Sequence, residues 1–496
     1  MQSNNTSSKG ITILGLGPAG AGSLTLEAWQ HLNAISELYL RTSFLPVAAE
    51  LPQNLRLHSF DYLWEEDEAE HPVEVLVSRL IDLAKTAQGV SYAVPGSPML
   101  AEETSRMLIE RAKAEALPVR IIDGMSFIEP VCRVLGIDLS PALVLADALA
   151  LGSLLVPSFS PAQAALITQI TNRQLASEVK LTLMANYPDE FPVRFVHAAG
   201  TDSQEIEEIP LWQIDHSPFI SALSTLYLPP REPGTSFEDF QEVIARLRAP
   251  DGCPWDREQT HLSLRQNLLE EAYEVLEALD KEDMEQLQEE LGDLLLQIVL
   301  HTQIANENED FKMSDVLAGI SQKLIRRHPH VFAEVVAENA EQVVNNWEQI
   351  KAEERKNKAK EAPKGMLDGI PHALPALIQA NQIQIRARRV GFDWQSFEPV
   401  IEKVREELQE LLEAKTPEEK EAEAGDLLFA CVNVIRWLKI DPEMALRETN
   451  ARFRKRFSYI EAKAAEQGKS LQELGFEAMD ALWNEAKEVF AKDEEA

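Results

Sequence analysis

The sequence has 496 residues, and its 82 acidic against 47 basic side chains give a formal net charge of −35. This acidic excess argues against stable binding to nucleic acid or to an anionic membrane. The length predicts two or three domains rather than one core. The three cysteines lie far apart without C-x-x-C spacing, which argues against a disulfide framework and against a thiolate zinc site.

The sequence contains no sign of export or of membrane insertion. The stretch "MQSNNTSSKG" is polar and lacks the charged and then apolar pattern of a signal peptide. The most apolar region, "ALVLADALALGSLLVP", is interrupted by Asp147, Gly152 and Pro157 and is too short to span a bilayer. We therefore expect a cytoplasmic protein.

Residues 1–228 are predicted to form an α/β domain. Short apolar runs such as "GITILGLGPAG", "VSYAVPGSP" and "PVRIIDGMS" alternate there with Gly/Pro turns and helical stretches. The segment 229–236, "PPREPGTS", is rich in proline and has no periodicity, so we interpret it as a linker.

The remainder is predicted to be all-α, because long amphipathic stretches of helical period replace the strand pattern. It reads as two related helical domains, 237–350 and 366–496, joined by a charged linker at 351–365. Glu407 follows Glu271 by 136 positions, and Trp483 follows Trp347 by the same offset, which indicates a tandem duplication.

Each helical repeat carries two pairs of acidic residues, with the members of each pair three positions apart. We call Glu271, Glu274, Glu290 and Asp293 the first quartet, and Glu407, Glu410, Glu423 and Asp426 the second quartet. Residues three apart share one face of a helix, so a helical hairpin would bring each quartet together. A capping box at Thr416–Glu419, with Pro417 at the first helical position, predicts where the second helix of the second hairpin begins.

Four converging carboxylates repel one another unless a cation lies among them. Ligands that are all oxygen favour a hard ion, Mg²⁺ or Mn²⁺. Because Mg²⁺ usually keeps waters and is completed by substrate phosphates, a nucleotide polyphosphate is the natural substrate of such a site. The alternative is an ordinary solvated acidic face, but the recurrence of the pattern at matching places favours a metal site.

The stretches "DGCPWDREQTHLSLRQNLLEEAYEVLEAL", "EELGDLLLQIVLH" and "RRHPHVF" resemble the MazG branch of the all-α nucleoside triphosphate pyrophosphohydrolases. The resemblance extends from Phe237 to Phe490. It implies hydrolysis of a nucleoside triphosphate to the monophosphate and diphosphate, with Mg²⁺ or Mn²⁺ held by the quartets. It further implies a homodimer and a role in removing unwanted nucleotides.

The same resemblance implies a set of substrate-binding residues, since "TNARFRKRF" and "ALWNEAKEVF" are similar to the family's triphosphate-contacting elements. These residues are Asn450, Arg452, Arg456, Trp483 and Lys487 in the second repeat, and Lys323, Arg327, Trp347 and Lys351 in the first. Glu406 and Glu270, each next to a metal ligand, are the candidates to orient or deprotonate the attacking water. The resemblance ranks the second repeat first for catalysis. Arg452 and Arg456 lie four positions apart, so they also fit a solvent-exposed helical face on which arginines pair with nearby acidic residues.

The amino-terminal stretches "ITILGLGPAGAGSLTLEAWQHL" and "VSYAVPGSPMLAEETSRMLIERA" resemble the tetrapyrrole (corrin/porphyrin) methylases, from Gly10 to Tyr227. The resemblance implies two α/β subdomains with S-adenosylmethionine bound between them. It places the cofactor against Gly15, Gly17, Pro18, Pro95, Gly96, Ser97, Ser126 and Phe127. The sequence has "PGSP" where porphyrin-modifying members tend to have "GGDP", so the methyl acceptor stays open. The fusion of both modules is similar to the YabN-type proteins of bacteria.

Two other functions stay open at this stage. The chain could be a methyltransferase whose helical repeats serve only dimerisation. It could also be a nucleotide sensor, which binds metal and nucleotide without turnover.

Overall fold

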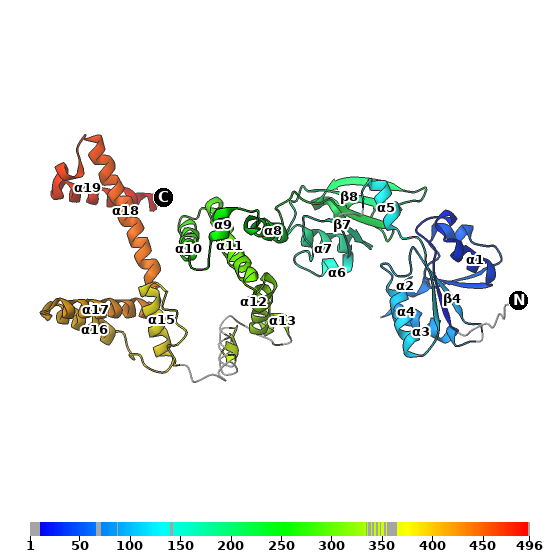
Figure 1. Cartoon of the computed structure of the whole chain (residues 1–496), viewed down its shortest axis with the longest axis horizontal. Coiled ribbons are helices and arrows are strands. Elements are labelled where there is room, and N and C mark those ends of the chain that lie inside the picture. Colours follow the sequence, from blue (N-terminus) through cyan, green and yellow to red (C-terminus); the bar gives the residue numbers. More distant parts are fainter. Residues whose placement is uncertain are drawn as a thin grey trace. The chain divides into compact units, whose positions relative to one another are not determined.

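The computed structural model describes residues 10–65, 71–86, 88–138, 142–333 and 365–494, together with scattered residues between 335 and 354 (Figure 1). The chain divides into two compact units, Met1–Gly319 and Ile320–Ala496. Among the described residues, no helix combines the length and the apolar composition needed to cross a bilayer.

The first subdomain is a parallel five-stranded sheet covered on both faces by helices. Its strand order is β3-β2-β4-β1-β5. The strands are β1 (Ile11–Gly15), β2 (Glu37–Leu40), β3 (Arg56–Ser59), β4 (Val90–Val94) and β5 (Val119–Ile122). The helices are η1 (Ala21–Ser23), α1 (Leu26–Ala34), η2 (Pro46–Glu50), α2 (Tyr62–Glu65), α3 (Pro72–Ala84) and α4 (Glu103–Ala114).

The central strand β1 shows why this sheet has two covered faces. Successive side chains on a strand point to opposite faces. Ile13 packs into a core with α3 and α4, whereas Leu14 packs into a second core with α1. A strand buried on both faces reads as a continuous apolar run, which is what "ITIL" is.

The second subdomain is a mixed sheet with the order β6-β7-β10-β8-β9, in which only the β6–β7 pair is parallel. Its strands are β6 (Leu143–Asp147), β7 (Ala164–Thr168), β8 (Pro192–His197), β9 (Glu205–Pro210) and β10 (Ser224–Leu228). Its helices are α6 (Ala148–Gly152), α7 (Arg173–Leu183) and η3 (Leu211–His216). Helix α5 (Ile128–Leu135), which follows the first sheet, packs through Val131 against Leu166 and Val196 of the second. The predicted α/β part is thus confirmed.

Beyond residue 236 the described chain is helical, as predicted. The helices are α8 (Phe237–Arg248), α9 (Pro254–Glu258), α10 (Arg265–Asp280), α11 (Met284–Glu307), α12 (Met313–Arg327) and α13 (Pro329–Phe332), then α15 (Ala376–Arg388), α16 (Glu398–Glu413), α17 (Pro417–Trp437), α18 (Pro442–Glu466) and α19 (Leu471–Glu494). The proposed linker 229–236 contains neither helix nor strand, and most of the proposed linker 351–365 lies outside the described residues.

Two helical hairpins, α10–α11 and α16–α17, carry the quartets. Each begins with a 16-residue helix. Asp283 caps the start of α11 by accepting hydrogen bonds from the backbone N–H groups of Glu285 and Gln286. Thr416 and Glu419 form the predicted capping box at the start of α17, with Pro417 as its first residue. These caps fix the turns that fold the helices of each pair back on one another.

Candidate functional site

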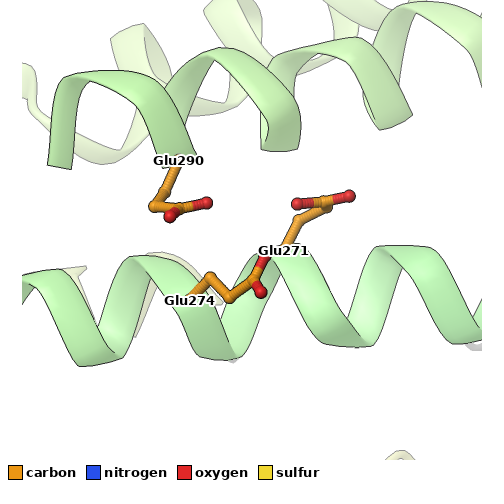
Figure 2. A group of neighbouring side chains, drawn as sticks. All are labelled: Glu271, Glu274 and Glu290. Atoms are coloured by element: carbon orange, nitrogen blue, oxygen red, sulfur yellow. The ribbon is translucent and has the colours of Figure 1, made fainter. Parts of the chain in front are cut away.

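The first quartet converges across the α10–α11 hairpin. Glu271 and Glu274 project from α10, and Glu290 reaches toward them from α11 (Figure 2). One carboxylate oxygen from each of the three lies within 4.8 Å of the others. The i, i+3 spacing therefore does what the sequence predicted, since it directs both glutamates of α10 toward one point on the neighbouring helix.

The carboxylates of this cluster repel one another. Partial burial raises the pKa of Glu271, and the neighbouring charges of Asp293, Glu274 and Glu290 raise it further. Asp293 is thus close enough to influence Glu271, as the fourth member of the quartet should be. A hard divalent cation would relieve this repulsion, so the donor set fits Mg²⁺ or Mn²⁺.

The second quartet has the same arrangement on α16 and α17. Oxygens of Glu407, Glu410 and Glu423 lie within 4.8 Å of one another. Glu407 is buried, with 6% of its surface exposed. Desolvation raises the pKa of Glu423, and the charges of Glu410, Asp426 and Glu407 add to the shift. The duplicated sequence pattern therefore corresponds to a duplicated geometry.

A lysine distinguishes the second quartet from the first. Lys403 Nζ lies 2.7 Å from Glu407 and 2.9 Å from Glu406, and these contacts raise the pKa of the lysine. The first repeat has Asn267 at the matching position, four residues before Glu271. Lys403 was not among the predicted site residues. Its position four residues before Glu407, on the same helical face, was the signal that could have identified it.

The two proposed water-activating glutamates differ in their contacts. Glu406 pairs with Lys403 and has 57% of its side chain exposed. Glu270 is exposed and lies 3.5 Å from the amide nitrogen of Gln266. Both stand next to a quartet member in the chain, and their role stays a prediction.

The basic and aromatic residues proposed to bind substrate in the second repeat lie on α18 and α19, not on the helices that hold the quartet. The Arg456 guanidinium lies 5.6 Å from the centre of the Trp483 ring, and Phe453 packs 4.9 Å from the same ring. Arg452 pairs with Glu448 at 3.6 Å, the kind of surface ion pair that was the alternative interpretation. Asn450 is exposed on α18, and Lys487 Nζ lies 3.3 Å from Asn484 Oδ1 on α19.

In the first repeat the corresponding residues also gather around a tryptophan. Arg327 and Lys351 lie 5.4 and 4.4 Å from the centre of the Trp347 ring. Arg327 also pairs with Glu354 at 2.6 Å, and this bond is the main cause that lowers the pKa of Glu354 to about 2. Lys323 is exposed on α12. These residues belong to the second compact unit and the first quartet belongs to the first, so each group is described by itself.

The predicted cofactor loops of the methylase-like domain meet at the carboxyl ends of β1, β4 and β5. Gly17 and Gly96 exchange backbone hydrogen bonds of 3.1 and 2.9 Å, and both have positive φ, at 74° and 66°. A Cβ atom on Gly15 would lie 2.5 Å from the backbone nitrogen of Gly124. Gly124 was not among the predicted residues, although "IIDG" follows the strand–turn pattern that identified Gly15.

The other predicted residues of these loops surround the same meeting point. Pro18, Pro95 and Ser97 are half-buried next to the two bridged glycines. Ser126 accepts a 3.1 Å hydrogen bond from the backbone N–H of Ile128, while Phe127 packs against the core of the second subdomain. The loops thus join both subdomains.

Comparison with known proteins identifies both parts of the chain. A family model described as "MazG nucleotide pyrophosphohydrolase domain" matches residues 259–332, and one described as "Tetrapyrrole (Corrin/Porphyrin) Methylases" matches residues 10–215. The "Nucleoside triphosphate pyrophosphohydrolase/pyrophosphatase MazG" of Thermotoga maritima is 46% identical over 257 residues, which are 52% of this chain and 98% of that protein. The chain belongs to the MazG family.

Two further relatives match the MazG part of the chain, and one of them matches nearly the whole chain. The "Nucleoside triphosphate pyrophosphohydrolase" of Escherichia coli is 46% identical over 251 residues, which cover 49% of this chain and 94% of that protein. The Bacillus subtilis protein described as "Uncharacterized protein YabN" is 42% identical over 489 residues, which cover 97% of this chain and 98% of YabN. The similarity to YabN thus spans both the methylase-like part and the MazG part of this chain. The MazG family model itself matches within the first repeat.

Proposed function

We propose that the protein hydrolyses nucleoside triphosphates to the monophosphate and diphosphate in a reaction that depends on Mg²⁺ or Mn²⁺. The observation that carries this proposal is the same convergence of carboxylates in two hairpins of a MazG-family chain. In each cluster the neighbouring carboxylates raise the pKa of one glutamate, Glu271 in the first and Glu423 in the second, and a bound cation would offset this repulsion.

In this proposal, the four acids of a quartet would hold the metal ion, which would supply charge stabilisation for the departing diphosphate. Water attacks the α-phosphorus, the bond to the bridging oxygen of the β-phosphate breaks, and diphosphate leaves. Glu406 in the second repeat, or Glu270 in the first, orients the water and accepts its proton. Arg452 and Arg456 bind the triphosphate and balance charge on the leaving group.

We further propose that the chain acts as a homodimer. Arg456 and Trp483 lie on the α18–α19 pair while the second quartet lies on α16–α17, so a second copy would offer its basic helices to the acids of the first. Phe453, Phe476 and Leu446, with 55%, 79% and 49% of their surface exposed, give these two helices apolar area for such a contact. The proposed role is removal of unwanted nucleotides in the cytoplasm, where nucleotide pools are held.

For the amino-terminal domain we propose binding of S-adenosylmethionine at the loops after β1, β4 and β5. The glycines there let the backbone approach a ligand closely. The cofactor would supply an activated methyl group, and the identity of the methyl acceptor stays open.

The test is a screen for diphosphate release from the common ribo- and deoxyribonucleoside triphosphates in MgCl₂ and in EDTA. Release that requires the metal supports the proposal. Binding of S-adenosylmethionine with all triphosphates left intact would favour a methyltransferase with helical dimerisation elements. Metal-dependent nucleotide binding without release would favour a sensor.

A further inference from the structure

A cavity of about 580 Å³ lies within the first compact unit, where the methylase-like domain passes into the helical part of the chain. The second subdomain lines it with residues 157–161 and with Ala185 and Asn186, which follow α7. The linker and the start of α8 line it with Arg231 and with residues 235–238. None of these residues belongs to a quartet or to the predicted cofactor loops. Sites for small molecules commonly have volumes of about 300–1,000 Å³, so the cavity has the size of a ligand site.

Arg231 holds the linker against the second subdomain and presents its guanidinium to the cavity. Its backbone N–H donates a 2.8 Å hydrogen bond to the carbonyl oxygen of Pro161. One terminal nitrogen of its side chain donates a 2.6 Å hydrogen bond to the carbonyl oxygen of Asn186. A guanidinium has five N–H donors, so four remain for a ligand after this bond.

The charge of Arg231 is not balanced by an acidic side chain. Among the described residues, no carboxylate oxygen lies within 4.0 Å of its guanidinium, although the chain has 82 acidic against 47 basic side chains. Glu238 is the one acidic residue among the described residues that line the cavity, and it is exposed. Arg231 itself is half-buried. A half-buried charge without a partner is costly, and a bound anion would offset that cost.

A buried hydroxyl near Arg231 also lacks a partner. Tyr187, next to Asn186 in the chain, has 2% of its surface exposed, and its hydroxyl oxygen is buried without a hydrogen-bond partner among the described residues. Burial raises the pKa of Tyr187 to about 12, and the nearby charge of Arg231 acts in the opposite direction. The guanidinium therefore lies close to this hydroxyl. Both groups can donate hydrogen bonds, so an anion with several acceptor oxygens suits this region.

The rest of the cavity offers hydroxyl groups and two aromatic side chains. Ser158 and Ser160 both line it. The Ser160 oxygen accepts a 3.3 Å hydrogen bond from the backbone N–H of Ala162, which leaves its O–H free to donate. Phe159 comes from the second subdomain and Phe237 is the first residue of α8. The cavity therefore combines donors for an anion with apolar surface for a flat ring.

We propose that this cavity binds a nucleoside monophosphate, with the phosphate on Arg231 and the base against Phe159 and Phe237. The proposal rests on the proposed function, because the monophosphate is a product of that hydrolysis. Arginine binds phosphate through parallel N–H···O bonds, and aromatic side chains stack on any base. One guanidinium opposite Glu238 matches the charge of a monophosphate better than that of a triphosphate.

The position of the cavity gives such a ligand a means to act on both parts of the chain. Phe159 packs against the core of the second subdomain. Phe237 packs against the core of the first MazG repeat, which contains Ile244 and Val299. A ligand held between the two phenylalanines would therefore strengthen the attachment of α8 to the methylase-like domain, and the released product would report on turnover at this junction.

The first experiment measures binding of AMP, GMP, CMP and UMP to the full chain by calorimetry in EDTA, which removes metal-dependent binding at the quartets. The variant is Arg231→Gln, and the matched control is Arg173→Gln, which changes an exposed arginine of α7. We expect at least one monophosphate to bind the wild type and the control, and to bind Arg231→Gln at least tenfold more weakly, because a charged hydrogen-bond donor is lost. The parent nucleoside without its phosphate should bind the wild type at least tenfold more weakly as well.

A second variant keeps the test independent of the structural bonds of Arg231. Ser158 is exposed and lines the cavity, so Ser158→Asp adds a carboxylate there and leaves the contacts of Arg231 with Pro161 and Asn186 in place. The new charge should repel the phosphate and weaken binding at least tenfold. Its control is Ser153→Asp, an exposed position outside the cavity, which should bind as the wild type does.

Hydrogen exchange then shows where the monophosphate binds. The α8 amides of the wild type should exchange more slowly when the ligand is present, and those of Ser158→Asp should not respond. The proposal is overturned if no monophosphate binds, if Arg231→Gln and Ser158→Asp bind as the wild type does, or if binding leaves α8 exchange unchanged.

The site and the hydrolysis can fail separately. A chain that binds the monophosphate at this cavity but releases no diphosphate from any triphosphate would contradict the proposed hydrolysis and leave the site standing. A chain that hydrolyses triphosphates but binds no monophosphate would overturn the site and leave the hydrolysis standing.

Discussion

Replacing Glu271 with glutamine should stabilise the metal-free first hairpin and weaken its response to Mg²⁺. The carboxylate oxygens of Glu271, Glu274 and Glu290 lie within 4.8 Å of one another. Two unit charges at that separation repel by about 0.9 kcal/mol in water and about 3.5 kcal/mol at an effective dielectric of 20. The groups are partly exposed, so screening places the value near the lower figure, and loss of two repulsions should contribute about 1–2 kcal/mol.

The sign follows from the raised pKa of Glu271. A carboxyl whose pKa is higher in the folded than in the unfolded state destabilises the fold when it is ionised, and lowering the pH through that pKa relieves the effect. Glutamine mimics the neutral form at every pH. When Mg²⁺ is present, the wild-type hairpin becomes more stable than that of the variant, because the Glu271 carboxylate then serves as a metal ligand.

Hydrogen exchange of the α10 and α11 amides measures this locally, which suits a multidomain chain better than a single melting temperature. In EDTA, Glu271→Gln should slow exchange by roughly 5–30-fold relative to the wild type. On addition of Mg²⁺, the wild type should gain more protection than the variant. The control is Glu289→Gln, an exposed residue of α11. The reasoning would be refuted if the α10 and α11 amides of the variant exchanged faster than those of the wild type in EDTA. It would also be refuted if Mg²⁺ slowed exchange equally in both proteins.

Three further predictions concern the second quartet and the methylase-like domain. Lys403→Asn, which installs the residue found at the matching place in the first repeat, should tighten Mg²⁺ binding to the second quartet by about fivefold, since an ion pair of this kind contributes up to about 1 kcal/mol. Calorimetry measures this Mg²⁺ affinity in protein whose first quartet carries Gln and Asn in place of its Glu and Asp residues. The reciprocal change, Asn267→Lys, should weaken Mg²⁺ binding to the first quartet. The Mg²⁺ concentration for half-maximal diphosphate release should rise as the pH is lowered toward the raised pKa of Glu423, because protonation of this carboxylate removes a ligand charge. A half-maximal concentration that does not change with pH would contradict this. Gly17→Ala should destabilise its loop by about 1–2 kcal/mol and abolish S-adenosylmethionine binding, because its φ is 74° and the new Cβ would lie 2.5 Å from the Ser23 hydroxyl oxygen. Gly22→Ala is the control and should bind as the wild type, because its new Cβ would have none of the described atoms beyond its chain neighbours within 4 Å.

The parts that could be predicted from the sequence are those set by local spacing. The three-residue step from Glu271 to Glu274 fixes a shared helical face, and the capping box at Thr416 fixes the start of α17, so the convergence of each quartet followed from short-range rules. The alternation of apolar runs and turns likewise predicted the α/β domain.

The parts that could not be predicted depend on contacts between distant segments. Arg436 meets Asp393 from 43 positions along the chain, and Gln384 meets the backbone of Phe429 from 45 positions away. Neither residue type is unusual for a helix, so nothing in the local sequence indicates these contacts. Periodicity alone also gave no indication of whether the basic residues of α18 and the acids of α16 approach each other within one chain.

The most direct test of the central claim is diphosphate release by two double variants, Glu290→Gln/Asp293→Asn and Glu423→Gln/Asp426→Asn, measured beside the wild type in MgCl₂. The account predicts that the change in the second quartet removes most turnover, by at least a hundredfold, while the fold is retained. If Glu423→Gln/Asp426→Asn keeps its activity and Glu290→Gln/Asp293→Asn loses it, the chemistry belongs to the first repeat. Full activity in a chain that carries both pairs of substitutions would contradict the assignment of the quartets as metal sites.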